Sequence, residues 1–217
     1  MKNVFLSRRL FVATIAVMST ASVASATGLP SGTTLYPAPS GPGPDGGSLL
    51  LIGGAPIPFA TSTYSGTLTT SVLSNDASNP FGLNALTFTY LLSSNASSTN
   101  VIERLTTNGW SGFLTDVSFQ APATGTLPSY MDRQTSDVVG FGFLPAPLGP
   151  GTLNPGNTSA LLVIHTDATL FQPSFASVID GTVTSVASFS PAVIPEPGTM
   201  TLLATGLFMI TRRRMGR

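Results

Sequence analysis

Cysteine is absent from this chain of 217 residues, which excludes disulfides, thiolate metal sites and cysteine nucleophiles. A domain without disulfides depends on its core alone, and a chain of this length can provide one because a β-sandwich needs only about 100 residues. Histidine and tryptophan occur once each, as His165 and Trp110. One histidine without cysteine cannot build an ordinary zinc site, so we expect no metal of that kind.

Basic residues are nearly missing from the middle of the chain. Between Thr27 and Ile194 only Arg104 and Arg133 are basic, against eight acidic residues, and this region has a net charge of −6. An acidic region repels phosphate backbones, so we expect no nucleic-acid partner. The other basic residues lie at the two ends of the chain, where they are typical of membrane topology signals.

The N-terminal residues have the order of regions typical of a signal peptide. A basic start precedes the apolar run Leu10–Met18, and a stretch of small residues follows. Ala24 and Ala26 fit the A-x-A pattern, which predicts cleavage before Thr27. We therefore expect residues 1–26 to be a signal peptide and the protein to be exported.

Residues 192–217 combine a Pro-Glu-Pro motif with an apolar segment and an arginine cluster. Pro195 and Pro197 fix φ and lack amide donors, so they hold Glu196 in an extended conformation. The apolar stretch 199–211 predicts a helix, and it is followed directly by Arg212, Arg213 and Arg214. Arginines in this position stay on the cytoplasmic side of a membrane.

The apolar stretch is short for a membrane span. Its thirteen residues rise about 20 Å as a helix, compared with a hydrocarbon core of about 30 Å. A short apolar tail behind an extended motif is typical of a signal that is recognised and then removed, as a GPI tail is. The alternative is a plain C-terminal anchor that is retained.

The motif, the apolar helix and the arginines together resemble the PEP-CTERM sorting tail, over roughly the last 23 residues. The resemblance rests on Pro195, Glu196, Pro197 and the arginine cluster. It implies a protein of a Gram-negative bacterium that makes extracellular polysaccharide. It also implies an exosortase as partner, transient anchoring in the cytoplasmic membrane, and a final place at the cell surface or in the extracellular matrix.

The region between the two ends predicts an all-β fold. Residues 27–60 are rich in proline and glycine, which indicates an extended leader or linker, although Ser48–Ile52 has the composition of an edge strand. From residue 61 to 191 apolar residues recur at every second position, and Ala160–Ile164 is apolar throughout, as a central strand is. Seven or eight short strands favour an antiparallel β-sandwich of jelly-roll or Ig-like type over residues 61–191.

A hairpin is predicted near the end of this region. Ser174–Ile179 and Thr182–Phe189 alternate like strands and are separated by Asp180-Gly181. This dipeptide favours a two-residue type I′ turn.

No catalytic constellation is visible in the sequence. His165 ends the apolar strand, with Asp167 two residues later, but no G-x-S-x-G turn presents a serine, and Ser111 only approaches that pattern. We interpret His165 as structural and the protein as not an enzyme. The acidic residues are scattered singly, so no EF-hand is present, while calcium bound by carboxylates from separate loops remains an alternative.

Two aromatic residues are candidates for binding sugars. Trp110 and Tyr130 are predicted to stack on pyranose rings if the domain binds carbohydrate. For Trp110 the favoured interpretation is a place in the sandwich core beside Phe113. We expect a non-enzymatic surface or matrix protein that is associated with exopolysaccharide, with a carbohydrate-binding module as the first alternative and a small secreted hydrolase as a more distant one.

Overall fold

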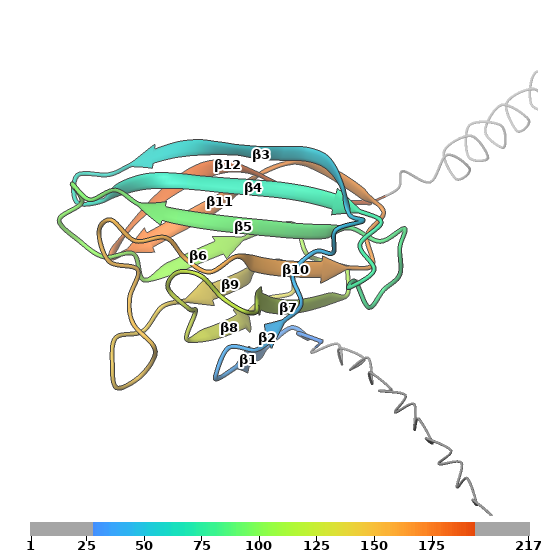
Figure 1. Ribbon diagram of the computed structural model, residues 1–217, viewed down its shortest axis with the longest axis horizontal. Helices are drawn as coiled ribbons and strands as arrows, with labels where there is room; N and C mark the ends of the chain where they lie inside the picture. The colour runs from blue at the N-terminus through green and yellow to red at the C-terminus, as the bar shows by residue number, and fades with distance from the viewer. Residues whose placement is uncertain (1–27, 194–217) are drawn as a thin grey trace, which may run out of the picture.

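In the computed structural model, residues 28–193 are described, and they form two six-stranded β-sheets that pack face to face (Figure 1). Sheet A contains, in spatial order, β2 (Ser40–Gly41), β7 (Thr115–Gln120), β10 (Leu162–Thr166), β5 (Thr87–Ser94), β4 (Ser65–Ser74) and β3 (Leu49–Ala60). Sheet B contains β1 (Thr33–Leu35), β8 (Tyr130–Arg133), β9 (Val139–Gly142), β6 (Arg104–Thr107), β11 (Leu170–Asp180) and β12 (Thr182–Ala192). Neighbouring strands are antiparallel except β2 and β7, which run parallel.

The alternating segments of the sequence form the strands that enclose the core. In β4, Leu68, Thr70 and Val72 are buried while the positions between them are partly exposed. All of β10 is buried, as its continuous apolar run predicts, because it lies between β7 and β5 and is covered by sheet B. The prediction of an all-β sandwich is therefore confirmed at the level of two packed sheets.

Large aromatic side chains from both sheets fill the space between the layers. Phe88 of β5 meets Trp110 edge to face, with ring centroids 5.2 Å apart. Tyr90 of the same strand packs against Phe141 of sheet B at 6.4 Å. Such contacts stabilise the sandwich beyond simple burial, and they replace the cross-links that a cysteine-free chain lacks.

The interpretation of residues 27–60 as a leader or linker is wrong for the part that the structure describes. This segment contributes β1 and β2 at one side of the sheets and the long edge strand β3 at the other side of sheet A. Leu29 is buried, with 1% of its surface exposed, and its amide donates to the Thr115 carbonyl at 2.9 Å. The many prolines misled the prediction, because they are tolerated at sheet edges, where an amide donor is not required.

The predicted hairpin is confirmed, but its turn is of another type. β11 and β12 pair along their whole length, and the register places Asp180 opposite Thr182 with only Gly181 between them. Gly181 has φ of 61°, whereas Asp180 is not among the described residues with positive φ. A type I′ turn needs positive φ at both central residues, so the assignment to that type is a correction.

The two ends of the sandwich can be told apart by register. Tyr64, just before β4, donates to the carbonyls of Val178 and Thr182, and further along Thr70 lies 3.4 Å from Ser188. β4 and β12 therefore run in the same direction, and both finish at one end of the molecule.

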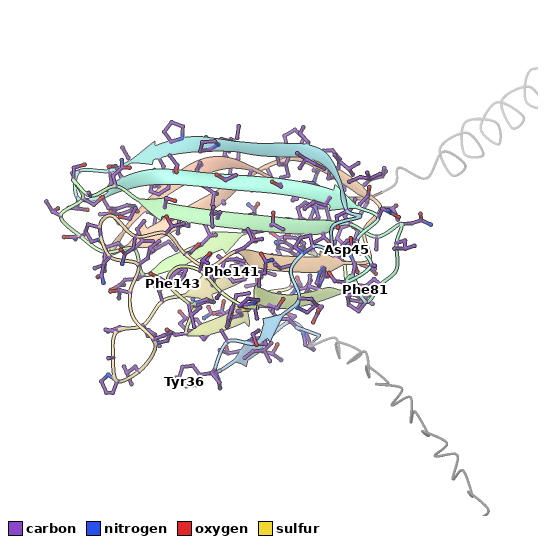
Figure 2. All side chains as sticks on the ribbon, viewed as in Figure 1. Tyr36, Asp45, Phe81, Phe141 and Phe143 are labelled. Atoms are coloured by element: carbon purple, nitrogen blue, oxygen red, sulfur yellow. The ribbon has the colours of Figure 1, made fainter. Side chains whose placement is uncertain are left out.

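That end, where β12 finishes and Val193 follows, is called the exit end below. The strand registers place other strand ends there as well. β4 and β10 finish at this end, and β3, β5, β7 and β11 begin at it. It is the right-hand side of Figure 1, and Figure 2 places Asp45 and Phe81 there. The opposite end, which holds the turn at Gly181, is called the far end.

The predicted signal peptide, residues 1–26, and the predicted sorting tail from Pro195 onward lie outside the described residues. Within residues 28–193 the structure has no helix that is long and apolar enough to cross a membrane.

Candidate functional site

His165 lies at the exit end of sheet A between two carboxylates. Its Nδ1 atom is 3.3 Å from Oδ2 of Asp116 on β7, and its Nε2 atom is 3.5 Å from Oδ2 of Asp76 in the loop after β4. The hydroxyl of Ser78 lies 3.4 Å from the same Nε2. All three ionisable groups are buried, with at most 8% of each residue exposed.

Asp76 is the residue on which the neighbouring loops converge. Its carboxylate accepts hydrogen bonds from the hydroxyl of Ser78 at 2.7 Å and from that of Thr87 at 2.7 Å. It also accepts from the amides of Ser78 at 3.0 Å and Asp45 at 3.3 Å. The cluster thus joins the β4–β5 loop to β5, to β10 and to the segment that precedes β3.

The pKa values of His165 and Asp76 depend on each other. Burial lowers the pKa of His165, but the bonds to Asp116 and Asp76 and their negative charges outweigh it and raise the pKa above its ordinary value. Burial also raises the pKa of Asp76, yet the bonds from His165, Ser78 and Thr87 dominate and hold it well below its usual range. The geometry therefore favours a histidine cation flanked by carboxylates.

Ser78, His165 and Asp116 are arranged in the order of a nucleophile, a base and an orienting acid. This set was missed in the sequence, where only Ser111 and Asp167 were compared with such a pattern. One contact competes with such a role: the Ser78 hydroxyl donates to Asp76 at 2.7 Å, whereas it lies 3.4 Å from Nε2 of His165. The cluster ties Ser78 to Asp76 and so fixes the β4–β5 loop.

Trp110 and Tyr130, the candidates for sugar stacking, lie apart and have different surroundings. Trp110 is fully buried, and its indole Nε1 donates to the hydroxyl of Thr107 at 2.9 Å. A side chain without exposed surface cannot stack on a sugar, so the core alternative holds for Trp110. Tyr130 is half-buried, lies 5.8 Å below the Arg104 guanidinium and accepts a hydrogen bond from it at 3.1 Å. Its ring is used within sheet B.

Both basic residues of the described region are used internally. Arg104 makes a bidentate pair with the buried Asp132, at 2.6 and 2.9 Å. Arg133 donates to backbone carbonyls that include those of Trp110 and Ser136, each at 2.6 Å.

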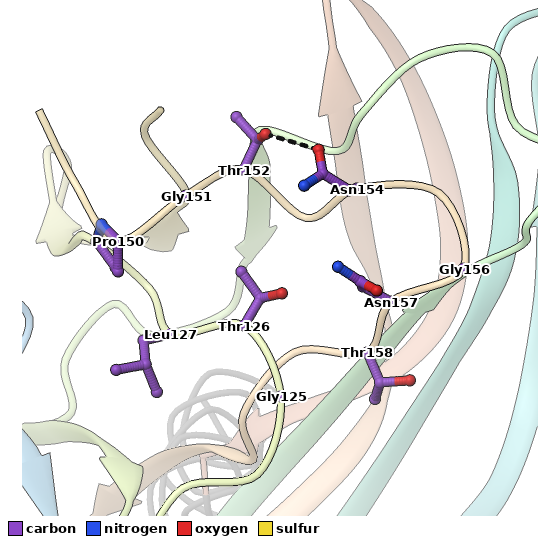
Figure 3. Close-up of a pocket in the computed structure, with 10 residues that line it drawn as sticks. All are labelled: Gly125, Thr126, Leu127, Pro150, Gly151, Thr152, Asn154, Gly156, Asn157 and Thr158. Carbon is purple, nitrogen blue, oxygen red and sulfur yellow. Dashed lines mark hydrogen bonds between the residues drawn. The ribbon is translucent and has the colours of Figure 1, made fainter. Parts of the chain in front are cut away.

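A pocket at the far end was not predicted from the sequence. It encloses about 650 Å³, and its described lining is uncharged (Figure 3): Gly125, Thr126, Leu127, Pro150, Gly151, Thr152, Asn154, Gly156, Asn157 and Thr158. The backbone of Asn157 bonds to that of Ser94, which places the pocket at the end of β5 opposite His165. Its volume is in the range of small-molecule sites.

Polar side chains in the pocket are free to bind a ligand. Within the described residues, its side-chain hydrogen bonds are Thr152 to Asn154 at 3.2 Å and Thr158 to Ser93 at 3.0 Å. Figure 3 shows Thr126 and Asn157 pointing toward each other across the opening. A hydroxyl and an amide without charge suit a neutral, hydroxyl-rich ligand. The lining residues come from two loops separated in sequence, so no local motif signalled them.

Among residues 28–193 the structure contains no group of three or more His, Cys, Asp or Glu side chains that could hold a metal ion. The carboxylates of Asp76 and Asp116 contact opposite nitrogens of His165, so the ring lies between them.

Comparisons with protein-family models, with curated proteins and with solved structures find no match to this chain.

Proposed function

We propose that this is an exported, non-enzymatic cell-surface or extracellular-matrix protein, sorted by an exosortase through its C-terminal tail and associated with exopolysaccharide. The observation that carries the proposal is where the motif stands relative to the folded domain. The pairing of β11 with β12 ends at Leu170 and Ala192, and Pro195 follows three residues later. A processing enzyme needs an extended segment outside a sheet, and the motif begins just past the last paired strand.

The non-enzymatic part of the proposal is supported by the state of His165. It is the only histidine of the chain, and both of its ring nitrogens face carboxylates. A general base has to be unprotonated and within reach of its substrate. The two carboxylates raise the pKa of His165, which favours its protonated form, and the ring is buried, so it is poorly placed to take a proton from a substrate.

Within the sandwich class we propose a jelly-roll rather than an Ig-like topology. The consecutive strands β5, β6, β7 and β8 alternate between sheet A and sheet B, so the chain crosses the sandwich at each step. Crossing connections of this kind are typical of double-sheet jelly rolls.

Mass spectrometry of the mature protein from its native host tests the sorting proposal. We expect the N-terminus at Thr27 and a C-terminus near Pro195–Pro197. Glu196→Gln should leave the tail attached and the protein membrane-bound, while the control Glu103→Gln, in an exposed loop residue of the domain, should be processed normally. Recovery of Arg217 in the surface-located wild-type protein would reduce the tail to a simple anchor.

The second candidate function, carbohydrate binding, is favoured by the far-end pocket. Its hydroxyl and amide groups match the hydrogen-bonding needs of a neutral glycan, and they lie at the opposite end of the sandwich from Val193. A glycan array probed with the full chain tests it. Binding that is lost in Asn157→Ala would assign the site to this pocket, and binding that is unchanged would place it elsewhere.

A further inference from the structure

Exposed apolar side chains are concentrated at the exit end. The first four residues of β3 are all exposed. The exposed fraction is 59% for Leu49, 56% for Leu50, 46% for Leu51 and 39% for Ile52. Their partners on β4 are Ser74, Leu73 and Val72, which places them at the finish of that strand. Single exposed leucines are ordinary, but four in succession at one end of an edge strand are not.

Further apolar residues lie at the same end. Leu83, 54% exposed, accepts a hydrogen bond from the amide of Asn75, directly after β4. Leu114, 61% exposed, precedes β7 and bonds to Asp167, just past β10. Leu170, 43% exposed, pairs with Ala192. These residues and Leu49–Ile52 form what we call the apolar rim.

The rim extends across the end of sheet A. It runs from β3 at one edge to β7, four strands away, which is about 19 Å at the usual strand spacing. Beside Leu114 lies a hollow of about 260 Å³ whose exposed atoms are largely apolar, although Thr115 and the internally bonded Arg133 also line it. An apolar surface of this breadth marks an interaction site.

The position of Val193 indicates what covers the rim. Val193, 72% exposed, is the last described residue and lies at the exit end. Five residues separate it from the apolar stretch that begins at Thr199, so the chain between Val193 and Thr199 spans at most about 22 Å. If that stretch is in a bilayer, the exit end cannot be farther from the lipid than this.

We propose that the apolar rim rests on the lipid surface while the tail is inserted, so that the sandwich stands with its exit end on the membrane and its far-end pocket directed away from it. This inference rests on the proposed membrane insertion of the tail. The exposed acidic residues Asp137 and Asp167 lie near the rim, so the surface suits neutral lipid rather than anionic lipid.

A second copy of the chain fits the rim less well. The free edge of β3 carries register shifts between Leu50 and Ile52 and between Gly53 and Pro56. Pro56 and Pro58 also lack amide donors. Bulges and prolines prevent an edge strand from pairing with another chain, whereas they leave its apolar side chains free to contact lipid.

Single-cysteine labelling of the full chain tests the proposal, because the native sequence has no cysteine. Leu114→Cys at the rim and Leu148→Cys in the loop after β9 form a matched pair, since both leucines are 61% exposed. Thr205→Cys reports on the tail. Each variant carries an environment-sensitive fluorophore and is reconstituted into phosphatidylcholine vesicles that contain lipids brominated near the head group.

We expect lipid quenching at positions 205 and 114 and none at 148. Replacing Leu50 and Leu51 together by Ser should reduce quenching at 114 and leave that at 205 unchanged. If the label at 205 is quenched but the label at 114 is quenched no more than the label at 148, the inference is overturned and the insertion of the tail is supported. Absence of quenching at 205 would overturn tail insertion and the inference with it. The rim would be assigned to a second copy of the chain, and the lipid contact overturned, by two results without vesicles: a doubled mass in light scattering and shielding of the label at 114 from water.

Discussion

The two ends of the sandwich differ in how they use polar groups. At the exit end the charged groups Asp76, Asp116 and His165 are buried and paired with each other, while leucines are exposed around them. At the far end the exposed pocket is lined by uncharged hydroxyl and amide groups, two of which have no partner within the described chain. The comparison indicates that one end is stabilised from inside and the other is open to a ligand.

The largest loss of stability is expected when His165, which lies between the two buried carboxylates of the exit end, is removed. His165→Ala leaves Asp76 and Asp116 buried without their common partner, and breaking a buried ion pair in this way costs about 3–5 kcal/mol. The free energy of unfolding, measured in urea at pH 6, should fall by that amount. Glu103→Gln, an exposed acid at the far end, should change it by less than about 0.5 kcal/mol. Similar losses in both variants would remove the contrast between the ends.

A smaller effect is expected from pH alone. Because the folded-state pKa of His165 is raised above 6.5, its contribution is complete below pH 6.5 and is lost as the pH rises through the folded-state value. Because the pKa of Asp76 is lowered from 3.8, its contribution is complete above that pH and is lost as the pH falls further. Unfolding free energies should therefore be highest between pH 3.8 and 6.5, and should decline as the pH rises through the folded-state pKa of His165.

The variant His165→Gln separates this effect from other titrations. It has no imidazole to deprotonate, so its unfolding free energy should lack the alkaline decline that the wild-type protein shows. An identical decline in both proteins would locate the pH dependence elsewhere.

The smallest effect on stability is expected at the far end. Asn157→Ala removes a side chain that has no hydrogen bond within the described residues, so the free energy of unfolding should stay within about 0.5 kcal/mol. If a neutral glycan binds there, the loss of one hydrogen bond of about 0.5–1.5 kcal/mol weakens binding roughly two- to tenfold by calorimetry. A large loss of stability without any change in binding would reverse the roles assigned to the two ends.

The sequence predicted those parts of the fold that are governed by local alternation. β5, β10 and the β11–β12 hairpin follow from their apolar patterns, because each buries one or both faces. β1, β2, β6 and β8 were missed. They have two to four residues each, which is too few for a period to be recognised.

The candidate sites could not be predicted from local patterns, because their residues are distant from one another in the sequence. Asp76, Asp116 and His165 stand on three different segments that only the sheet register brings together. The sequence did locate His165 at the end of a buried strand and indicated a structural role, and the paired carboxylates support that interpretation. The sorting motif at Pro195–Pro197 lies outside the described residues and stays a prediction.

The register of the first strand has a consequence for how the chain folds. Thr33 pairs with Arg133, which comes 100 positions later, so β1 has no partner until most of the domain has been delivered. β2 likewise waits for β7, whereas β3 pairs with the next strand, β4, as soon as that strand is made. Topologies dominated by distant pairings fold in milliseconds to seconds, so we expect β1 and β2 to join the sheets late in folding.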